Sequence, residues 1–400
     1  MKKPLKDSFI IGFALFSMFF GAGNVIFPPY LGLESGPHWL LGFISYYIAD
    51  IGLALLAMFA ILRQGSPEKV TSRIGKVPSV LLMCAIVLCI GPMLAIPRTA
   101  ATTFETSVTP LVSGVSPVLF SVLFFLLILS VVGVVSPIGP VGDQALVENV
   151  AATGIEAGYQ TMDVLATLLF GFIILKSAQA KGYTKAKAQI RVVSGASLVA
   201  GIGLLVVYLG LTYLGATTAN LFDITVDRTY LVTSIVQQLL GHGGLILFAI
   251  VVALACITTA VGLVSACANY FSGLSGGRLS YPVLVCLICL FSAVVSNFGI
   301  NEIIAIASPI LSVVYPPTLA LIVLALFGRR IRNDWVFRLA ALGALVISLL
   351  EVISSYTGLE IAFLSHLPLA SLGFAWVVPA LLCGVIGHFI PHGKKKSLAS

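Results

Sequence analysis

Charged side chains are scarce in this sequence. Asp, Glu, Lys and Arg make up 9% of its 400 residues and hydrophobic residues 59%, whereas soluble domains carry about 25% charged residues. So few charges cannot cover the surface of a water-soluble globule, which excludes that class of protein. We therefore expect an all-α polytopic membrane protein. All its spans would share one bundle, so residues 1–400 would form a single transmembrane domain.

Motifs for catalysis are also missing. The five histidines lie at the ends of apolar runs or in loops and form no H-E-x-x-H pair, and the sequence contains neither a G-x-S-x-G elbow nor a Walker motif. The seven cysteines all lie within apolar runs and show no disulfide framework. We therefore expect no enzyme, no ATP hydrolysis and no cofactor.

The spans can be located because runs of about 20 apolar residues are long enough to cross a bilayer. The sequence contains eleven such runs, which predict about eleven transmembrane helices. They lie near residues 9–31, 39–62, 77–103, 116–139, 160–180, 191–214, 243–272, 280–299, 302–327, 335–356 and 367–391.

The basic residues set the orientation of these spans, because Lys and Arg accumulate in cytoplasmic loops. All of them except Arg98 and Arg228 fall at the two termini or at alternate ends of the runs. This pattern predicts cytoplasmic amino and carboxyl termini and places the acidic stretches 142–156 and 217–227 outside. The net charge of +7 is thereby explained without a nucleic-acid partner.

The count of spans conflicts with this orientation. Three spans take the chain outside by about Thr106, and the run at 160–180 must also start outside. An even number of crossings is needed between them, yet only the run from Val115 to Val141 is present. This run could be a re-entrant hairpin bent near Gly133 or Pro137. We favour the alternative, in which one span has been lost.

The stretch from Ser17 to Tyr30 breaks the first run. Gly21-Ala22-Gly23-Asn24 lies at its centre and Pro28-Pro29 follows. Glycine lowers helix propensity and proline removes a backbone donor, so the helix is predicted to unwind here. Free N–H groups at such a break suit a carboxylate and free carbonyls suit a small cation. We interpret the stretch as the substrate and ion site of a secondary transporter; a tightly packed kinked helix is the alternative.

Two further stretches contain polar groups at suitable spacing. The carbonyl of Ala255 and the hydroxyls of Thr258 and Thr259 share one helix face and could surround a monovalent cation. Alternatively, each hydroxyl bonds the carbonyl one turn earlier. Thr161 and Asp163 could mark a second broken helix facing the first, or only cap a helix start.

Charged residues inside apolar runs are functional candidates, because a charge in the bilayer is costly. Asp50 lies in the second run and Arg98 in the third, so the two could pair. Glu302 opens the ninth run and Glu351 lies late in the tenth, where either could be interfacial.

Four segments of the sequence resemble one transporter family. They are IIGFALFSMFFGAGNVIFPPYLGL, CIGPMLAIPRTAATTFE, YQTMDVLATLLFGFI and LACITTAVGLVSACANYF. Together they resemble the branched-chain amino acid:cation symporters, whose bacterial members are the BrnQ-type carriers, within the LeuT-type (APC) superfamily. The resemblance implies two five-helix inverted repeats with broken first and sixth helices. The chain would lack one span of the first repeat, where the fourth and fifth helices merge at about 128–132.

The resemblance also implies a function and a set of site residues. The function is sodium-coupled import of leucine, isoleucine and valine across the bacterial cytoplasmic membrane. Proton coupling and a transport-deficient shortened member are the alternatives, and the oligomeric state stays open. The residues implied to bind substrate are Gly21, Ala22, Gly23, Asn24, Thr161 and Asp163. Those implied to bind Na⁺ are Ser17 and Phe20, through their carbonyls, with Ala255, Thr258 and Thr259.

Overall fold

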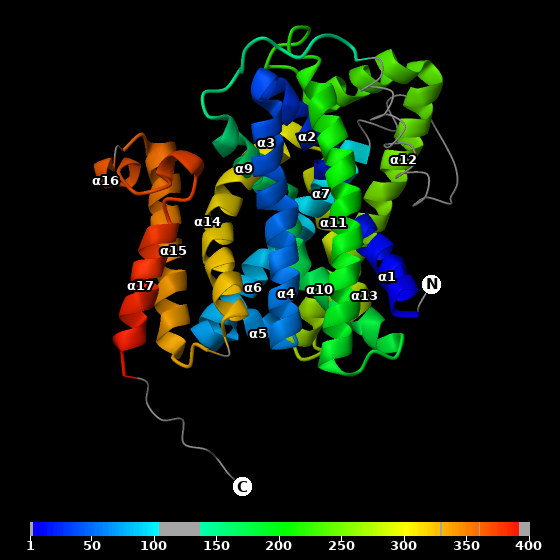
Figure 1. Ribbon diagram of the computed structural model, residues 1–400. Coiled ribbons are helices and arrows are strands. Elements are labelled where there is room, and N and C mark those ends of the chain that lie inside the picture. The colour runs from blue at the N-terminus through cyan, green and yellow to red at the C-terminus, as the bar shows by residue number, and fades with distance from the viewer. Residues whose placement is uncertain (1–2, 104–136, 329, 360, 392–400) are drawn as a thin grey trace. The chain divides into compact units, whose positions relative to one another are not determined.

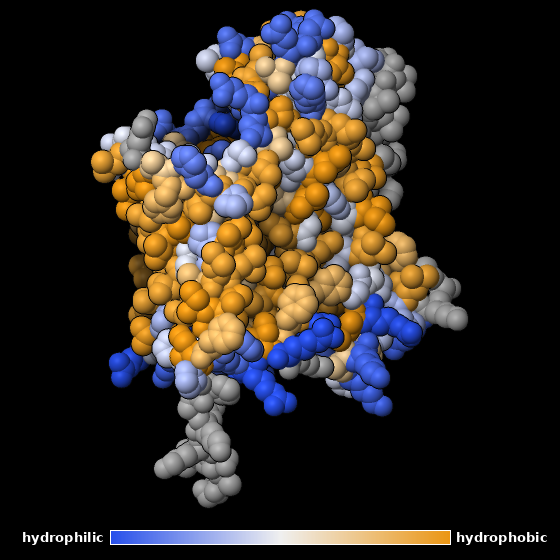
Figure 2. All heavy atoms as spheres, turned by 60° about the vertical axis from the view of Figure 1, so that its left-hand side comes forward, coloured by the Kyte–Doolittle hydropathy of each residue, from blue (hydrophilic) through white to orange (hydrophobic). Residues whose placement is uncertain are grey.

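The computed structural model describes residues 3–103, 137–328, 330–359 and 361–391. Throughout these residues the regular elements are helices and no strand occurs (Figure 1). The predicted all-α fold is confirmed. On the face shown in Figure 2, hydrophobic side chains predominate and hydrophilic ones gather at the upper and lower borders. This distribution is expected where apolar helix faces meet lipid.

Seven helical stretches among the described residues are long and apolar enough to cross a membrane, and two shorter apolar helices accompany them. The seven stretches are Gly23–Gln64, Lys76–Thr99, Val150–Ala180, Ala186–Ala216, Arg228–Leu274, Ile300–Leu326 and Asp334–Thr357, and the shorter helices are Tyr281–Ser296 and Val377–Phe389.

Two of the eleven predicted spans need comment. Most of the run at 116–139 lies outside the described residues, so the lost span stays a prediction. The run at 367–391 was predicted too long, because its helix α17 covers only Val377–Phe389. Leu369 and Gly373 adopt left-handed backbone angles (φ 67° and 77°), which interrupt a right-handed helix.

Backbone contacts divide the chain into two compact units, residues 1–58 with 86–311 and residues 59–85 with 312–400. The predicted single domain stays a prediction. The first unit contains α1 (Lys3–Phe19), α2 (Ala22–Ser35), η1 (Gly36–His38), α3 (Trp39–Tyr47), the π-helical η2 (Ile48–Gly52), η4 (Cys89–Met93), α7 (Ala95–Thr103), α9 (Val150–Thr161), α10 (Asp163–Ala180), α11 (Ala186–Ala216), α12 (Arg228–Leu274) and α13 (Tyr281–Ser296). Helices α4 (Leu53–Gln64), α6 (Lys76–Leu88) and α14 (Ile300–Leu326) contribute to both units.

Helix α11 is the support for both halves of the first broken span. Helices α1 and α2 pack along it; in Figure 1 they carry their labels and are blue, and α11 is green. Two glycines allow the backbones of α2 and α11 to touch. A Cβ on Gly215 would lie 1.8 Å from the Pro29 carbonyl oxygen, and one on Gly32 would lie 1.9 Å from that of Thr212. No side chain fits in this seam, so α2 is fixed closely against α11.

The second unit contains α5 (Pro67–Thr71), η3 (Ser72–Ile74), α15 (Asp334–Thr357), α16 (Ala362–Ser365), η6 (Ala370–Leu372) and α17. Its buried cluster consists of Leu321, Val336, Phe337 and Ala341. Arg73 covers this cluster: its guanidinium lies 3.8 Å from the centre of the Phe337 ring, and Nε donates to Asp334 Oδ1 at 2.7 Å.

Candidate functional site: two broken helices joined by their side chains

The first break separates α1 from α2 at Phe20 and Gly21. Helix α1 ends at Phe19, and Gly21 has extended backbone angles (φ −115°, ψ −169°). Asn24 caps the new helix, because its Oδ1 accepts the N–H of Gly21 at 3.2 Å. The predicted unwinding is therefore confirmed, and its capping residue is one of the predicted substrate ligands.

The second break separates α9 from α10 at a single residue. Met162 has a left-handed conformation (φ 68°), which costs a non-glycine residue about 1–2 kcal/mol. Thr161 is the last residue of α9 and Asp163 is the first of α10. A carboxylate at a helix N-terminus is favoured by the helix dipole. Of the two alternatives for these residues, the structure bears out the broken helix, because α9 precedes the break directly.

Arg98 of α7 closes the end of α9. Its guanidinium donates to the carbonyl of Gln160 and, at 3.2 Å, to that of Thr161. The last carbonyls of a helix have no partner within it and favour a cation. Arg98 is 4% exposed, and Gly23 lets it enter: a Cβ on Gly23 would lie 2.9 Å from Arg98 Nη2. The side chain thus lies against both breaks.

Direct side-chain contacts join the two breaks. Asn24 Nδ2 donates to Asp163 Oδ2 at 2.9 Å, and both residues are buried. Thr161 Oγ1 lies 2.8 Å from Asp50 Oδ1 and 2.6 Å from the Gly158 carbonyl oxygen. Asp50 belongs to the π-helical turn η2 and is fully buried. π-type turns are frequent at functional sites.

A small cavity of about 20 Å³ lies between these elements. That volume suits one water molecule or small ion and is too small for an amino acid. Gly21, Asn24, Arg98, Thr161, Asp163 and Thr259 contribute to its lining, together with apolar side chains. The cavity therefore brings together residues from both breaks and from α12.

The predicted sodium residues are partly brought together. A Cβ on Gly21 would lie 3.7 Å from Thr259 Oγ1, so α12 reaches the first break. Thr259 is 9% exposed, and its hydroxyl makes no hydrogen bond within the described structure. In a continuous helix the carbonyl of Ser17 would accept the N–H of Gly21. Here that N–H donates to the Phe19 carbonyl and to Asn24 Oδ1 instead. Ala255 is buried, and the side chains of Ala22 and Thr258 lie outside the description.

Among the described residues at the cavity, the charges do not balance when all three ionisable side chains are charged. Asp163 in the lining and Asp50, which contacts the lining Thr161, supply two negative charges, and Arg98 supplies one positive charge. A buried charge without compensation is expensive. The site is therefore suited to hold one further positive charge, which a monovalent cation, a substrate ammonium group or a proton could supply.

Asp50 and Arg98 are the site residues whose place the sequence did not reveal. Their charge within apolar runs marks them as candidates, and the sequence allows a pair between them. The contacts that the structure describes for them are not those of a simple ion pair. Arg98 donates hydrogen bonds to carbonyls of α9, while Asp50 contacts the side chain of Thr161. Glu302 and Glu351 do not line the cavity.

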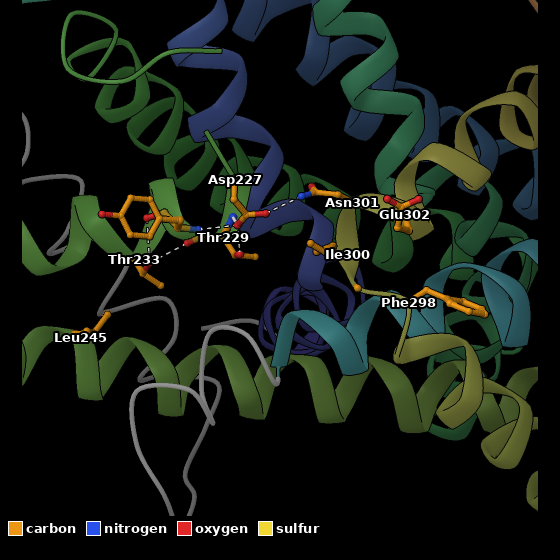
Figure 3. A pocket seen from close by; sticks show the side chains of 10 residues that line it. Asp227, Thr229, Thr233, Leu245, Phe298, Ile300, Asn301 and Glu302 are labelled. Atoms are coloured by element: carbon orange, nitrogen blue, oxygen red, sulfur yellow. Dashed lines mark hydrogen bonds between the residues drawn. The ribbon is translucent and has the colours of Figure 1, made fainter. Parts of the chain in front are cut away.

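A second pocket of about 810 Å³ lies within the first unit, near the start of α12 (Figure 3). Asp227 Oδ1 accepts the N–H groups of Thr229 and Tyr230 at 2.9 and 3.0 Å, and Oδ2 accepts Asn301 Nδ2 at 2.7 Å. Burial alone would raise the pKa of Asp227, but hydrogen bonds from Thr229, Tyr230 and Asn301 outweigh it and lower the pKa. The carboxylate thus caps α12 and anchors α14, which leaves it little capacity for a ligand.

Comparison with known proteins identifies similar sequences along nearly the whole chain. A family model described as "Branched-chain amino acid transport protein" matches residues 4–129 and 114–394. Branched-chain amino acid permease BraB of Bacillus subtilis is 33% identical over 427 residues, covering 97% of this chain and 96% of the relative. Branched-chain amino acid permease BrnQ of Escherichia coli K12 is 33% identical over 417 residues, with 95% and 94% covered.

Among solved structures, the inward-facing conformation of Mhp1 is similar in fold. The superposition has a TM-score of 0.57 at 12% identity and covers 95% of this chain and 90% of that one. The LeuT-type fold expected from the sequence is thereby confirmed.

Proposed function

The chain belongs to the branched-chain amino acid transport protein family, and from this premise we propose that it is a sodium-coupled symporter importing leucine, isoleucine and valine. It would lie in the bacterial cytoplasmic membrane with both termini inside. One observation carries the proposal: the Asn24–Asp163 hydrogen bond joins the two broken helices at a cavity that Thr259 also lines.

The substrate would bind between the two breaks. Free N–H groups at the start of α2, near Gly21 and Asn24, suit a carboxylate, and apolar walls suit a branched side chain. The cavity of about 20 Å³ is too small for leucine. Binding therefore requires α2 and α10 to separate, with loss of the Asn24–Asp163 contact. That motion would couple binding to a change of conformation.

Sodium would bind beside the substrate. The hydroxyl of Thr259 is buried without a partner and lies close to Gly21, while the Ser17 carbonyl lacks its helical donor. Oxygen ligands of this kind suit a hard cation. Na⁺ would promote uptake only if it raises the affinity for the amino acid, and the effect must be reciprocal.

Proton coupling is the second candidate, favoured by one contact. Thr161 Oγ1 lies within hydrogen-bond distance of both Asp50 Oδ1 and the Gly158 carbonyl oxygen. A hydroxyl has one proton, so Thr161 either shares it between the two acceptors or donates it to Gly158 while a protonated Asp50 donates to Thr161. A protonated Asp50 would also balance the charge of Arg98 and Asp163.

A shortened, transport-deficient protein is the third candidate. The two segments matched by the family model share residues 114–129, so this stretch aligns with two places in the family pattern. The match to BraB extends over 427 residues although this chain has 400. The difference of at least 27 residues exceeds the roughly 20 needed for one span.

Radiolabelled leucine uptake into proteoliposomes tests the three candidates. We would compare an inward sodium gradient, an inward proton gradient and no gradient, with protein-free liposomes as the control. Accumulation that depends on sodium supports the proposal, and accumulation that depends on protons alone replaces it with the second candidate. Leucine binding without accumulation under either gradient would indicate the shortened, transport-deficient protein.

A further inference from the structure

A groove in the second unit is unrelated to the central cavity. It has a volume of about 460 Å³ and lies between α6, α14 and α15, beside Ile74 at the end of η3. Every residue that lines it is apolar except Arg338. Prolines Pro78 and Pro317 and the small Ala341 contribute to its lining. Their side chains do not reach across the groove, which leaves an apolar channel along the helices.

The groove runs along its helices for about two turns. Its lining on α15 extends from Arg338 to Leu345, and on α6 from Pro78 to Ala85. Each stretch has eight residues, and seven helical steps of 1.5 Å span roughly 10 Å. Leu81 and Leu342 line the groove and are 65% and 52% exposed, so they mark the side on which the groove opens to the surface. The channel therefore opens toward the surface that would face lipid tails.

Arg338 is placed to receive a negative charge at one end of this channel. Its side chain is exposed, and its guanidinium lies 5.0 Å from the centre of the Trp335 ring. No carboxylate of the described residues forms an ion pair with it. Arg73, by contrast, is occupied by Asp334 at 2.7 Å.

The end of the channel at Arg338 is predicted to lie on the cytoplasmic side of the membrane. Arg338 follows the basic stretch Arg330–Arg332, and Pro78 follows Lys76, so both helices start from loops predicted to be cytoplasmic. Trp335 lies in the first turn of α15, and aromatic side chains at such helix ends are enriched where a span meets the lipid headgroups. An apolar channel with one available cation at the headgroup level complements an anionic headgroup with a hydrocarbon tail.

We propose that this groove binds an anionic phospholipid, with an acyl chain between α6, α14 and α15 and the headgroup on Arg338. The proposal concerns a surface separate from the transport site and does not depend on the identity of the substrate. The shape of the groove would bind the acyl chain and its charge would bind the headgroup. One substitution can therefore remove the charge and another can block the groove.

The test measures phospholipid retained by the purified full-length protein, using native mass spectrometry after exchange into equal amounts of phosphatidylglycerol and phosphatidylcholine. The unaltered protein should retain phosphatidylglycerol preferentially. Arg338→Gln should reduce that preference about fivefold, as expected for one cation near the membrane surface. Leu342→Trp, at the exposed rim, should reduce retention of both lipids. Arg332→Gln, an exposed cation outside the lining, is the matched control and should change nothing.

Three results would overturn the proposal. The first is equal retention of the two lipids by the unaltered protein, and the second is an equal effect of Arg338→Gln and Arg332→Gln. The third is a dimer that Leu342→Trp dissociates without a change in bound lipid, because the groove would then contact a second copy of the chain. Circular dichroism and thermal unfolding of each variant separate these results from misfolding.

Discussion

Asn24 and Asp163 lie 139 positions apart in the sequence and share a hydrogen bond of 2.9 Å in the buried centre of the first unit. Each is a terminal group of its own broken helix: Asn24 caps α2, and Asp163 begins α10. One side chain thus fixes the local geometry of one break and holds it against the other. A change at either residue should affect both breaks together.

The first prediction concerns this pair. Asn24→Ala removes the cap and leaves Asp163 without its donor, which should cost about 1–3 kcal/mol for the unpaired polar group. We expect thermal unfolding at lower temperature and leucine binding at least tenfold weaker. Asn301→Ala is the matched control, since it removes a 2.7 Å bond to Asp227 at an exposed site. Equal effects of the two substitutions would show that the central pair has no special role.

The second prediction uses two neighbouring glycines. Gly23→Ala would place a Cβ 2.9 Å from Arg98 Nη2, whereas the nearest atom to a Cβ on Gly21 is 3.5 Å away. Overpacking of this kind costs about 1–3 kcal/mol. We expect Gly23→Ala to lower uptake at least tenfold at normal membrane levels, and Gly21→Ala to change it less than about threefold. Equal uptake by both variants would exclude a requirement for Arg98 close to α2.

The third prediction tests the hydroxyl of Thr259. Thr259→Val keeps the shape of the side chain and removes its oxygen, so the sodium concentration for half-maximal uptake should rise about tenfold, as expected for loss of one polar ligand. Thr259→Ser should keep the original value. The double variant Thr258→Ala with Thr259→Ala should raise it further while membrane insertion stays intact. An unchanged sodium dependence in an active Thr259→Val protein would remove this residue from the site.

The fourth prediction concerns pH and the start of α1. Tyr183 Oη donates to Asp7 Oδ2 at 2.8 Å, and Lys181 Nζ lies 3.4 Å from Asp7 Oδ1. The Tyr183 hydrogen bond is the main reason that the pKa of Asp7 is lowered. A carboxyl with a lowered pKa stabilises the fold above its unfolded value, about 3.9, and the contribution is lost as the pH falls through the folded value.

We therefore expect Asp7→Asn to lower the unfolding temperature at pH 7. The difference from the unaltered protein should shrink below about pH 4, where the unfolded carboxyl is protonated. The comparison requires thermal unfolding of both proteins across this pH range, with the exposed Asp143→Asn as control. A difference that stays constant from pH 7 to pH 3 would show that ionisation of Asp7 makes no contribution.

The sequence predicted the first break because its signal is local: the glycines next to Asn24 disfavour a continuous helix. It left the second break open, since the break residue itself is Met162, whose type does not signal a left-handed conformation. The partners of Arg98 and Asp50 could not be predicted, since their hydrogen bonds join residues 62 and 111 positions apart. The charge of each residue marked it as costly in lipid, but only the folded chain shows which group compensates it.

In the last apolar run, a local signal led to a prediction that was too long. Hydropathy alone extended it from 367 to 391, while the helix begins at Val377. Apolar composition measures preference for lipid and does not report backbone conformation. The left-handed Leu369 and Gly373 therefore escaped a prediction based on composition.

The seam between α2 and α11 has an evolutionary consequence. Gly32 and Gly215 each face a carbonyl oxygen less than 2 Å from where a Cβ would lie. No neighbouring side chain can be trimmed to make room, because the obstacle is backbone. Substitution at either position would require a whole helix to shift, and a shift of α2 would move Asn24, which lines the cavity. We therefore expect lineages that keep transport to keep both glycines, even where the surrounding apolar residues drift freely.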